Sequence, residues 1–189
     1  MDTTLPIAYL SILLIVLLSA GIVVFRQVLK TRRTENSLGR LQKKLKDEKG
    51  TAQEYYELGS IYLEKKLYAQ AIALFQKALK AAEQEEENVA PIYNGLGYAA
   101  FCQEQYDLAI RHYKDALKHK PDYVVALNNL GHAYEKKNLT APALETYEQV
   151  LKAQPNNTTA KRRAESIRKR LVTSNQWPVT SDQWPVKMY

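Results

Sequence analysis

The first pattern along the chain is a long run of uncharged, mostly apolar residues near the N-terminus. Residues 3 to 25 contain no charged side chain. At about 1.5 Å per residue a helix of this length measures roughly 35 Å, enough to cross the hydrocarbon core of a bilayer. The pattern predicts a single transmembrane helix, and we place this anchor at residues 1–25. Basic side chains follow it directly at Arg26, Lys30, Arg32 and Arg33.

A cleaved secretory signal is the alternative explanation of the same run. Such a signal needs a positive N-terminal region and small residues before the cut, whereas only Met1 and Asp2 precede the run, and Leu18 lies three positions before a cut after Ala20. We therefore expect an uncleaved anchor. Because positive charge flanks only its C-terminal end, residues 26–189 are expected on the cytoplasmic side or its organellar equivalent.

The segment after the anchor, residues 26–50, is strongly basic. It holds nine Lys or Arg against three acidic residues, which accounts for most of the net charge of +7. Leu38, Leu41 and Leu45 recur at helical spacing, which predicts an amphipathic connector helix that ends at Gly50. The charge either fixes the membrane topology or binds anionic lipid headgroups. The candidate lipid-facing residues are Arg26, Lys30, Arg32, Arg33, Lys43, Lys44 and Lys46.

Beyond residue 50 the chain repeats itself three times, with segments that start at Ala52, Ala90 and Val124. The three segments overlay in one register without a gap, and a shared pattern of small, aromatic and apolar residues runs through all of them. The matching positions are Tyr55, Tyr93 and Leu127; Leu58-Gly59, Leu96-Gly97 and Leu130-Gly131; Ala71, Ala109 and Ala143; Phe75, Tyr113 and Tyr147; Ala78, Ala116 and Val150.

This pattern resembles the tetratricopeptide repeat (TPR), a pair of antiparallel helices. The resemblance implies a TPR α-solenoid of three helix pairs plus a capping helix, which together with the predicted N-terminal transmembrane helix makes an all-α fold. We assign the repeats to residues 52–155, as 52–89, 90–123 and 124–157; the capping helix to 158–172; and a disordered tail to 173–189.

Each repeated position has a physical reason. Small residues such as Gly97 and Ala109 allow two helices to pack closely, and aromatic side chains fill the remaining space. Pro121 and Pro155 end the second helices of repeats two and three, because proline has no amide hydrogen to donate. Stacked helix pairs need a cap at the end of the array. Residues 158–171 present Ala160, Ala164, Ile167 and Leu171 on one side and basic residues elsewhere.

Repeat one departs from the pattern. Glu83 replaces the closing proline, and the interval from Ala52 to Ala90 is four residues longer than the interval from Ala90 to Val124. The four additional residues predict about one more helical turn. Glu83, Glu85, Glu86 and Glu87 gather there, either as a solvated helix end or as a docking site.

Catalytic and metal-binding patterns are not found. The one cysteine, Cys102, cannot form an internal disulfide, and His112 and His119 are too far apart along the chain for a helical ligand pair. No phosphate loop or nucleophile motif occurs, and the basic charge accompanies no nucleic-acid module. We therefore expect no enzyme, no cofactor, no metal, no small-molecule substrate and no nucleic acid.

Function in this class of repeat lies on the concave face formed by the first helix of each pair. Positions two, five, nine, twelve and thirteen of each repeat point into it. The partner-binding groove predicted from these positions consists of Tyr56, Ser60, Asn94, Tyr98, Phe101, Asn128 and His132, with Leu63, Cys102 and Glu135 beside them. Alternatively, one or two of the aromatics pack under the capping helix. Lys136 is the only basic residue at these positions, which argues against a chaperone tail as ligand.

The anchor and repeats together resemble a narrower family, the membrane-anchored TPR proteins that assist photosystem I assembly in cyanobacteria and plastids. The likeness rests on the run from Leu5 to Lys80, with Arg26-Gln27-Val28, Gly50-Thr51-Ala52 and Tyr56-Glu57-Leu58-Gly59-Ser60. It implies a thylakoid location, a stromal or cytoplasmic repeat domain, and photosystem I subunits or assembly intermediates as partners.

The sequence leaves two questions open. The tail repeats Gln-Trp-Pro-Val at residues 176–179 and 183–186, which that family pattern does not explain. A scaffold of the bacterial envelope or division machinery, or a regulator that depends on a lipid surface, would show the same anchor and repeats.

Overall fold

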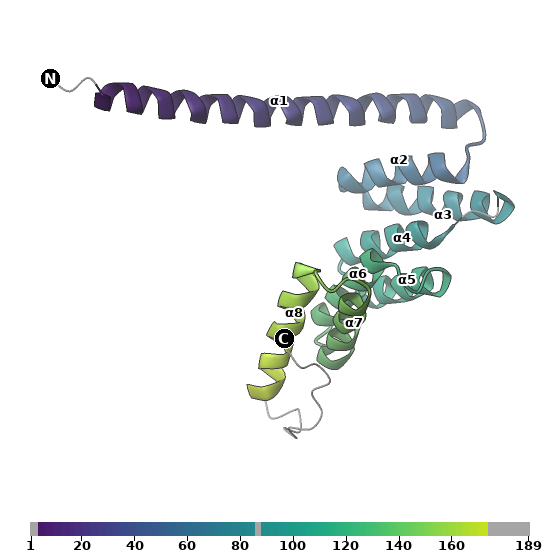
Figure 1. Ribbon diagram of the computed structural model, residues 1–189. Helices are drawn as coiled ribbons and strands as arrows, with labels where there is room; N and C mark the ends of the chain where they lie inside the picture. The colour runs from purple at the N-terminus through teal and green to yellow at the C-terminus, as the bar shows by residue number, and fades with distance from the viewer. Residues whose placement is uncertain (1–3, 86–87, 174–189) are drawn as a thin grey trace. The chain divides into compact units, whose positions relative to one another are not determined.

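The computed structural model describes residues 4–85 and 88–173, and every regular element in that part of the chain is an α-helix. The chain divides into two units, one ending at Gly50 and one beginning at Thr51. Helix α1, Thr4–Asp47, forms the first unit (Figure 1). The second unit contains α2 Ala52–Glu64, α3 Tyr68–Glu85, α4 Ala90–Cys102, α5 Tyr106–His119, α6 Val124–Lys136, α7 Thr140–Ala153 and α8 Thr158–Thr173.

Two predictions from the sequence concern residues outside the described ranges. Apart from Thr173, which ends α8, the tail predicted for residues 173–189 lies outside the described residues, and so does its Gln-Trp-Pro-Val duplication. Glu86 and Glu87 of the acidic cluster also lie outside them.

Helix α1 continues through the point where we separated anchor from connector. Its 44 residues form one uninterrupted helix that ends shortly before Gly50. Gly39 lies within this helix with no atom near the position of a Cβ, so it lowers helix propensity without ending the helix. The sequence contains no proline between Pro6 and Pro91 that could interrupt α1.

The predicted repeat fold is confirmed: α2 with α3, α4 with α5, and α6 with α7 form three helix pairs, and α8 follows them. The first helices begin at the residues where the sequence repeats begin, Ala52, Ala90 and Val124. Helix α3 has 18 residues against 14 in α5 and in α7, so repeat one does contain the additional turn.

Local signals fix several helix ends. Thr51 caps α2, because its side chain accepts a hydrogen bond from the Glu54 amide while the Glu54 carboxylate accepts one from the Thr51 amide. Pro91 occupies the first turn of α4, where no intrahelical donor is needed. Each repeat turns between its two helices through one left-handed residue at the same repeat position: Lys66, Glu104 and Asn138, with φ of 60°, 60° and 57°.

The small and aromatic positions pack as the pattern predicts. A Cβ built on Gly97 would lie 2.6 Å from the Tyr113 ring, and one on Gly59 or Gly131 would lie 2.8 Å from Phe75 or Tyr147. Real Cβ atoms do not come that close, so the ring faces lie directly on the glycine backbone. Only glycine permits this approach of the two helices of one repeat.

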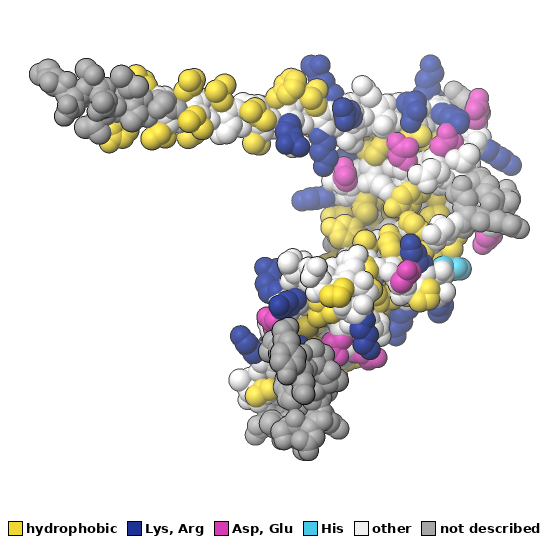
Figure 2. Space-filling view, viewed as in Figure 1, with side chains coloured by type: hydrophobic (Ala, Val, Ile, Leu, Met, Phe, Trp, Pro, Cys, Tyr) yellow, Lys and Arg dark blue, Asp and Glu magenta, His cyan; other side chains and the backbone are white. Residues whose placement is uncertain are grey.

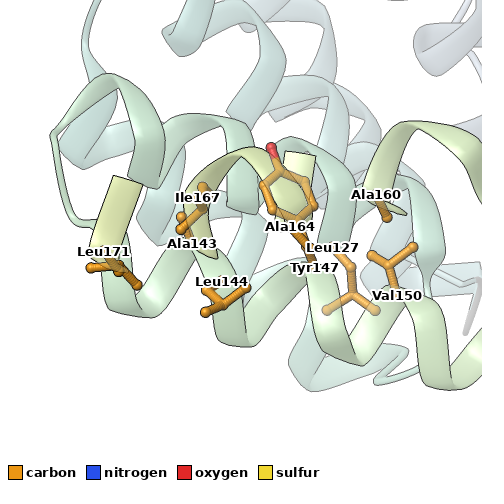
Figure 3. Close-up of a cluster of buried hydrophobic side chains, with 9 residues drawn as sticks. All are labelled: Leu127, Ala143, Leu144, Tyr147, Val150, Ala160, Ala164, Ile167 and Leu171. Carbon is orange, nitrogen blue, oxygen red and sulfur yellow. The ribbon is translucent and has the colours of Figure 1, made fainter. Parts of the chain in front are cut away.

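The capping helix closes the core of the last repeat. Ala160, Ala164, Ile167 and Leu171 of α8 are buried, as the sequence predicted. Figure 3 shows these side chains meeting Leu127 of α6 and the apolar residues of α7. Burial of such surface stabilises the array by about 25 cal/mol for each Å² removed from water.

Candidate protein-binding face

The predicted groove positions lie on the first helices α2, α4 and α6, and we call this surface the first-helix face. Tyr98 is the most open of the seven predicted residues, with 43% of its surface exposed. The other six, Tyr56, Ser60, Asn94, Phe101, Asn128 and His132, are half-buried. The face therefore presents one exposed aromatic side chain among partly covered neighbours.

Contacts between α4 and α6 show that their predicted residues lie together. The Asn129 amide donates a hydrogen bond of 3.0 Å to the side-chain oxygen of Asn94. The Phe101 and His132 rings contact each other with their centroids 4.8 Å apart. The structure thus joins the repeat-two and repeat-three parts of the first-helix face into one surface.

The two half-buried aromatics are held by neighbouring repeat helices rather than by the cap. Tyr56 lies beside Phe75, with ring centroids 5.8 Å apart, in the core of repeat one. Phe101 meets the edge of Tyr106 at 5.4 Å as well as His132. Tyr56, Tyr98 and Phe101 are absent from the buried cluster that α8 covers in the described structure, so the alternative of packing under the cap was wrong.

Most polar groups of the predicted set already have internal partners. The Ser60 hydroxyl donates to the Tyr56 carbonyl at 2.9 Å, and the Asn128 amide donates to the Val124 carbonyl at 3.1 Å. The Asn128 side-chain oxygen is buried and has no hydrogen-bond partner in the described part of the chain. The Ser60 and Asn128 side chains are therefore engaged within their own helices.

Tyr98 keeps its phenolic proton over the physiological range. The negative charge that the neighbouring Cys102 carries as a thiolate disfavours a second anion and raises the pKa of Tyr98, and burial raises it further. A neutral hydroxyl beside an exposed ring can bury apolar surface and still donate or accept a hydrogen bond. This combination suits an anchor point for a protein ligand.

Glu135 was expected on the binding face, but it is part of a network with α8. The Tyr147 hydroxyl donates to its carboxylate at 2.7 Å, Arg163 donates at 3.3 Å, and Arg170 lies 3.6 Å away. Only 15% of the Glu135 side chain is exposed. This network joins α6, α7 and α8, and no sequence pattern indicated it because its members lie on three different helices.

The network also affects the two aromatic groups that border it. Burial raises the pKa of Tyr147, and its hydrogen bond to Glu135 acts in the same direction. Burial lowers the pKa of His132, and the charge of Arg163 lowers it further. His132 is therefore neutral at pH 7 and above, and contacts Phe101 as an uncharged ring.

Helix α8 follows the same register as the first helices of the repeats. It begins at Thr158, as far beyond Val124 as Val124 lies beyond Ala90, and its buried positions three, seven and ten correspond to those of α4. The eighth position is the exception, because the glycine is replaced by Glu165, which is exposed. No helix with an aromatic residue packs there in the described chain, so no glycine is needed. Helix α8 thus corresponds to a fourth first helix, and no second helix follows it among the described residues.

The basic residues of α1 lie at different distances from the apolar run. All seven candidate lipid-facing residues are exposed. At about 1.5 Å per residue, Arg33 lies roughly 12 Å along the helix axis from Phe25, and Lys43 roughly 27 Å. Figure 2 shows the hydrophobic side chains on the N-terminal part of α1 and the basic side chains beyond them. One helix, α1, is long and apolar enough among the described residues to cross a membrane.

The described residues contain no group of three or more His, Cys, Asp or Glu side chains that could hold a metal ion. The first-helix face buries apolar side chains and pairs charges.

Comparisons with known proteins agree with this geometry. Two family models described as tetratricopeptide repeat match residues 48–122 and 100–163. Among solved structures, YrrB, described as a TPR protein with an unusual peptide-binding site, superposes with a TM-score of 0.62 at 23% identity over 79% of this chain and 73% of its own. The first TPR of Spaghetti (RPAP3), bound to an HSP90 peptide, gives 0.60 at 22% over 66% and 96%. The chain is a TPR protein, a class of protein-interaction modules.

Relatives of known sequence define the family more narrowly. The ycf37 protein of Cyanophora paradoxa is 40% identical over 85% of this chain and 92% of its own length. The chloroplastic TPR domain-containing protein PYG7 of Arabidopsis thaliana is 34% identical over 90% of this chain, which spans 56% of PYG7. The chain belongs to the ycf37 family.

Proposed function

We propose that this chain is a membrane-tethered scaffold that binds proteins and assists the assembly or stability of photosystem I at the thylakoid membrane. The proposal is supported by the family, by a chloroplastic relative, and by the long apolar helix α1. The observation that carries it is the joined first-helix face, in which Tyr98 is exposed beside half-buried Phe101. Photosystem I subunits or assembly intermediates are the proposed partners.

A membrane anchor suits this role because it raises the effective concentration of the face near membrane partners without additional contacts. Weak, reversible binding is then sufficient, which is what an assembly scaffold needs. The basic flank at Arg26, Lys30, Arg32 and Arg33 supports an orientation with the repeats on the stromal or cytoplasmic side. Along a straight α1 these four side chains lie within roughly 12 Å of Phe25, nearer to lipid headgroups than Lys43, Lys44 and Lys46, which lie roughly 27 Å or more away.

Affinity purification from gently solubilised membranes tests the proposal. Tagged full-length protein is expressed in a photosynthetic host, and co-purifying proteins are identified by mass spectrometry. We expect photosystem I subunits to be enriched, and to be lost when Tyr98→Ala and Phe101→Ala are combined. The matched control is Leu108→Ala with Leu139→Ala, which removes two exposed apolar side chains that lie on no first helix.

The result also separates the other candidate functions. Recovery of envelope or division proteins without photosystem I subunits would overturn the proposed partner and favour an adaptor for another membrane complex. Unchanged capture by the Tyr98 and Phe101 variant would remove the first-helix face from the function. Loss of partners only when Arg26, Lys30, Arg32 and Arg33 are neutralised would favour a regulator that depends on a lipid surface.

A further inference from the structure

The first-helix face extends onto α8, and its charge changes along the array. Because α8 follows the register of the first helices, its positions two, five, nine, twelve and thirteen continue the surface formed by α2, α4 and α6. These positions are Thr159, Arg162, Ser166, Lys169 and Arg170, and all five are exposed. The same positions hold no basic residue in α2 or α4 and only Lys136 in α6.

The contacts between α6 and α8 support this continuity. Arg163 and Arg170 of α8 both reach Glu135, at 3.3 and 3.6 Å, and Glu135 stands at position twelve of α6. One turn before Glu135 on α6, His132 contacts Phe101 of α4. A continuous path of neighbouring side chains therefore runs from the aromatic part of the face to the basic residues of α8.

The positive charge at this end is not neutralised by the network. Arg163 and Arg170 share the single carboxylate of Glu135, so two guanidinium groups face one negative charge. Arg162 and Lys169 are exposed and add two further positive charges. Such a cluster attracts an acidic group and repels a basic one.

We propose that the α8 end of the first-helix face binds an acidic stretch of a partner polypeptide, whose neighbouring apolar residue is seated at Tyr98 and Phe101. This inference rests on the proposed function, because it uses the same face, and it adds the chemistry of the partner. Packed helices lie about 8–10 Å apart, so α4 and α8 are separated by roughly 16–20 Å along the face. An extended peptide covers that distance in about five or six residues.

A peptide fits this surface better than a lipid headgroup does. Headgroups would satisfy Arg162, Lys169 and Arg170 but would leave the exposed ring of Tyr98 unused. A polypeptide can meet both the aromatic and the basic part in one extended segment. The order of the two parts along the face also sets the order of apolar and acidic residues that a partner must present.

Fluorescence anisotropy with full-length protein in nanodiscs of zwitterionic lipid tests the inference. The probe is a labelled synthetic peptide with one leucine and a run of glutamates about six residues away. A second peptide has glutamine in place of every glutamate. We expect the glutamate peptide to bind about tenfold more tightly at low salt, the effect of three exposed charge pairs of ordinary strength. The difference should shrink in high salt.

Matched variants locate the effect. Arg162→Gln, Lys169→Gln and Arg170→Gln together should remove the preference for the glutamate peptide. Lys80→Gln, Arg111→Gln and Lys152→Gln, one on each second helix, change the net charge equally and should leave it intact. Helical circular dichroism of both variants shows whether the fold is retained.

Each outcome decides the inference. Equal binding of the two peptides, or equal losses in the two triple variants, would overturn it. Loss of the preference in nanodiscs that contain anionic lipid, but not in zwitterionic ones, would assign the α8 residues to headgroups instead. If both peptides bind equally but still require Tyr98 and Phe101, the inference fails and the proposed function stands. If neither peptide needs the two aromatics, the face itself is not the binding site.

Discussion

At the scale of single residues, aromatic rings pack directly on glycine backbone. Gly97 lies under Tyr113 with no space for a methyl group. Gly95, which is not part of the repeated pattern, is in the same situation beneath Phe75 of the preceding repeat. Phe75 is therefore clamped between two glycines of successive repeats, so its ring fixes both the helix pair of repeat one and the stacking of repeat two upon it.

We predict that Gly97→Ala destabilises the protein by about 1–3 kcal/mol, because the added Cβ meets a fully packed ring and forces a backbone shift. Urea unfolding followed by circular dichroism measures the change. Gly97→Ala combined with Tyr113→Leu should be less destabilised than the sum of the two single variants, because the smaller side chain leaves space for the methyl group. Additive effects would show that the two residues are not in contact.

The turn residues with positive φ give a second prediction at this scale. A left-handed conformation costs an ordinary L-residue about 1–2 kcal/mol, whereas glycine adopts it freely. Glu104→Gly should therefore raise the free energy of unfolding by up to about 1 kcal/mol, since part of the gain is offset by the flexibility of glycine in the unfolded chain. The midpoint of urea unfolding checks it. Asn138→Glu, at the matching position of repeat three, should shift the midpoint the other way.

At the scale of elements, α8 covers the core of the last helix pair in the described chain. In stacked repeats each unit contacts only the next, so the last pair needs a cover for Leu144 and Tyr147. Helix α8 supplies it with the buried positions of a first helix. Its exposed Glu165 replaces the glycine, because no second helix follows in the described chain to need the space.

We predict that Ile167→Ala lowers the free energy of unfolding by about 2–5 kcal/mol, because this α8 side chain is fully buried against the preceding helix pair and its removal leaves a cavity. Val172→Ala on the same helix removes a half-exposed side chain and should change stability by less than about 0.5 kcal/mol. Denaturant unfolding of both variants provides the comparison. Similar midpoints for the two would mean that α8 does not close the core.

At the scale of the whole molecule, the chain consists of two units with different surroundings. Helix α1 exposes large apolar side chains from Tyr9 to Phe25, whereas the unit that begins at Thr51 buries a hydrophobic core of its own. Exposed apolar surface of this extent is costly in water and favourable in a bilayer. The two units thus have separate means of stabilisation.

We predict that the full chain stays with membranes through an alkaline carbonate wash, whereas a variant without residues 4–25 is released as a folded helical protein. Immunoblotting of pellet and supernatant, with circular dichroism of the released form, makes the measurement. Protease added to the stromal or cytoplasmic face should remove the repeats of the full chain. Complete extraction of the full chain by carbonate would contradict the anchor.

The sequence by itself determined the helices, the repeat register and the core. The regular interval between repeats and the periodic placement of Leu, Gly, Ala and aromatic residues are local signals, and burial of each follows from helical geometry. It also placed Tyr98 and Phe101 on one face. Even the register of α8 was present in the spacing, although its basic residues concealed the match until burial showed which side of the helix packs.

Only the tertiary structure decided which side chains remain available. Glu135 belongs to the face by position, yet Tyr147, Arg163 and Arg170 engage it from two other helices. Asn94 and Asn129 pair across two repeats, and Gly95 meets an aromatic ring of another repeat. Such contacts depend on how successive helix pairs stack. Periodicity fixes which face of a helix is buried, but the partner of each side chain is set by the three-dimensional arrangement of the neighbouring repeats.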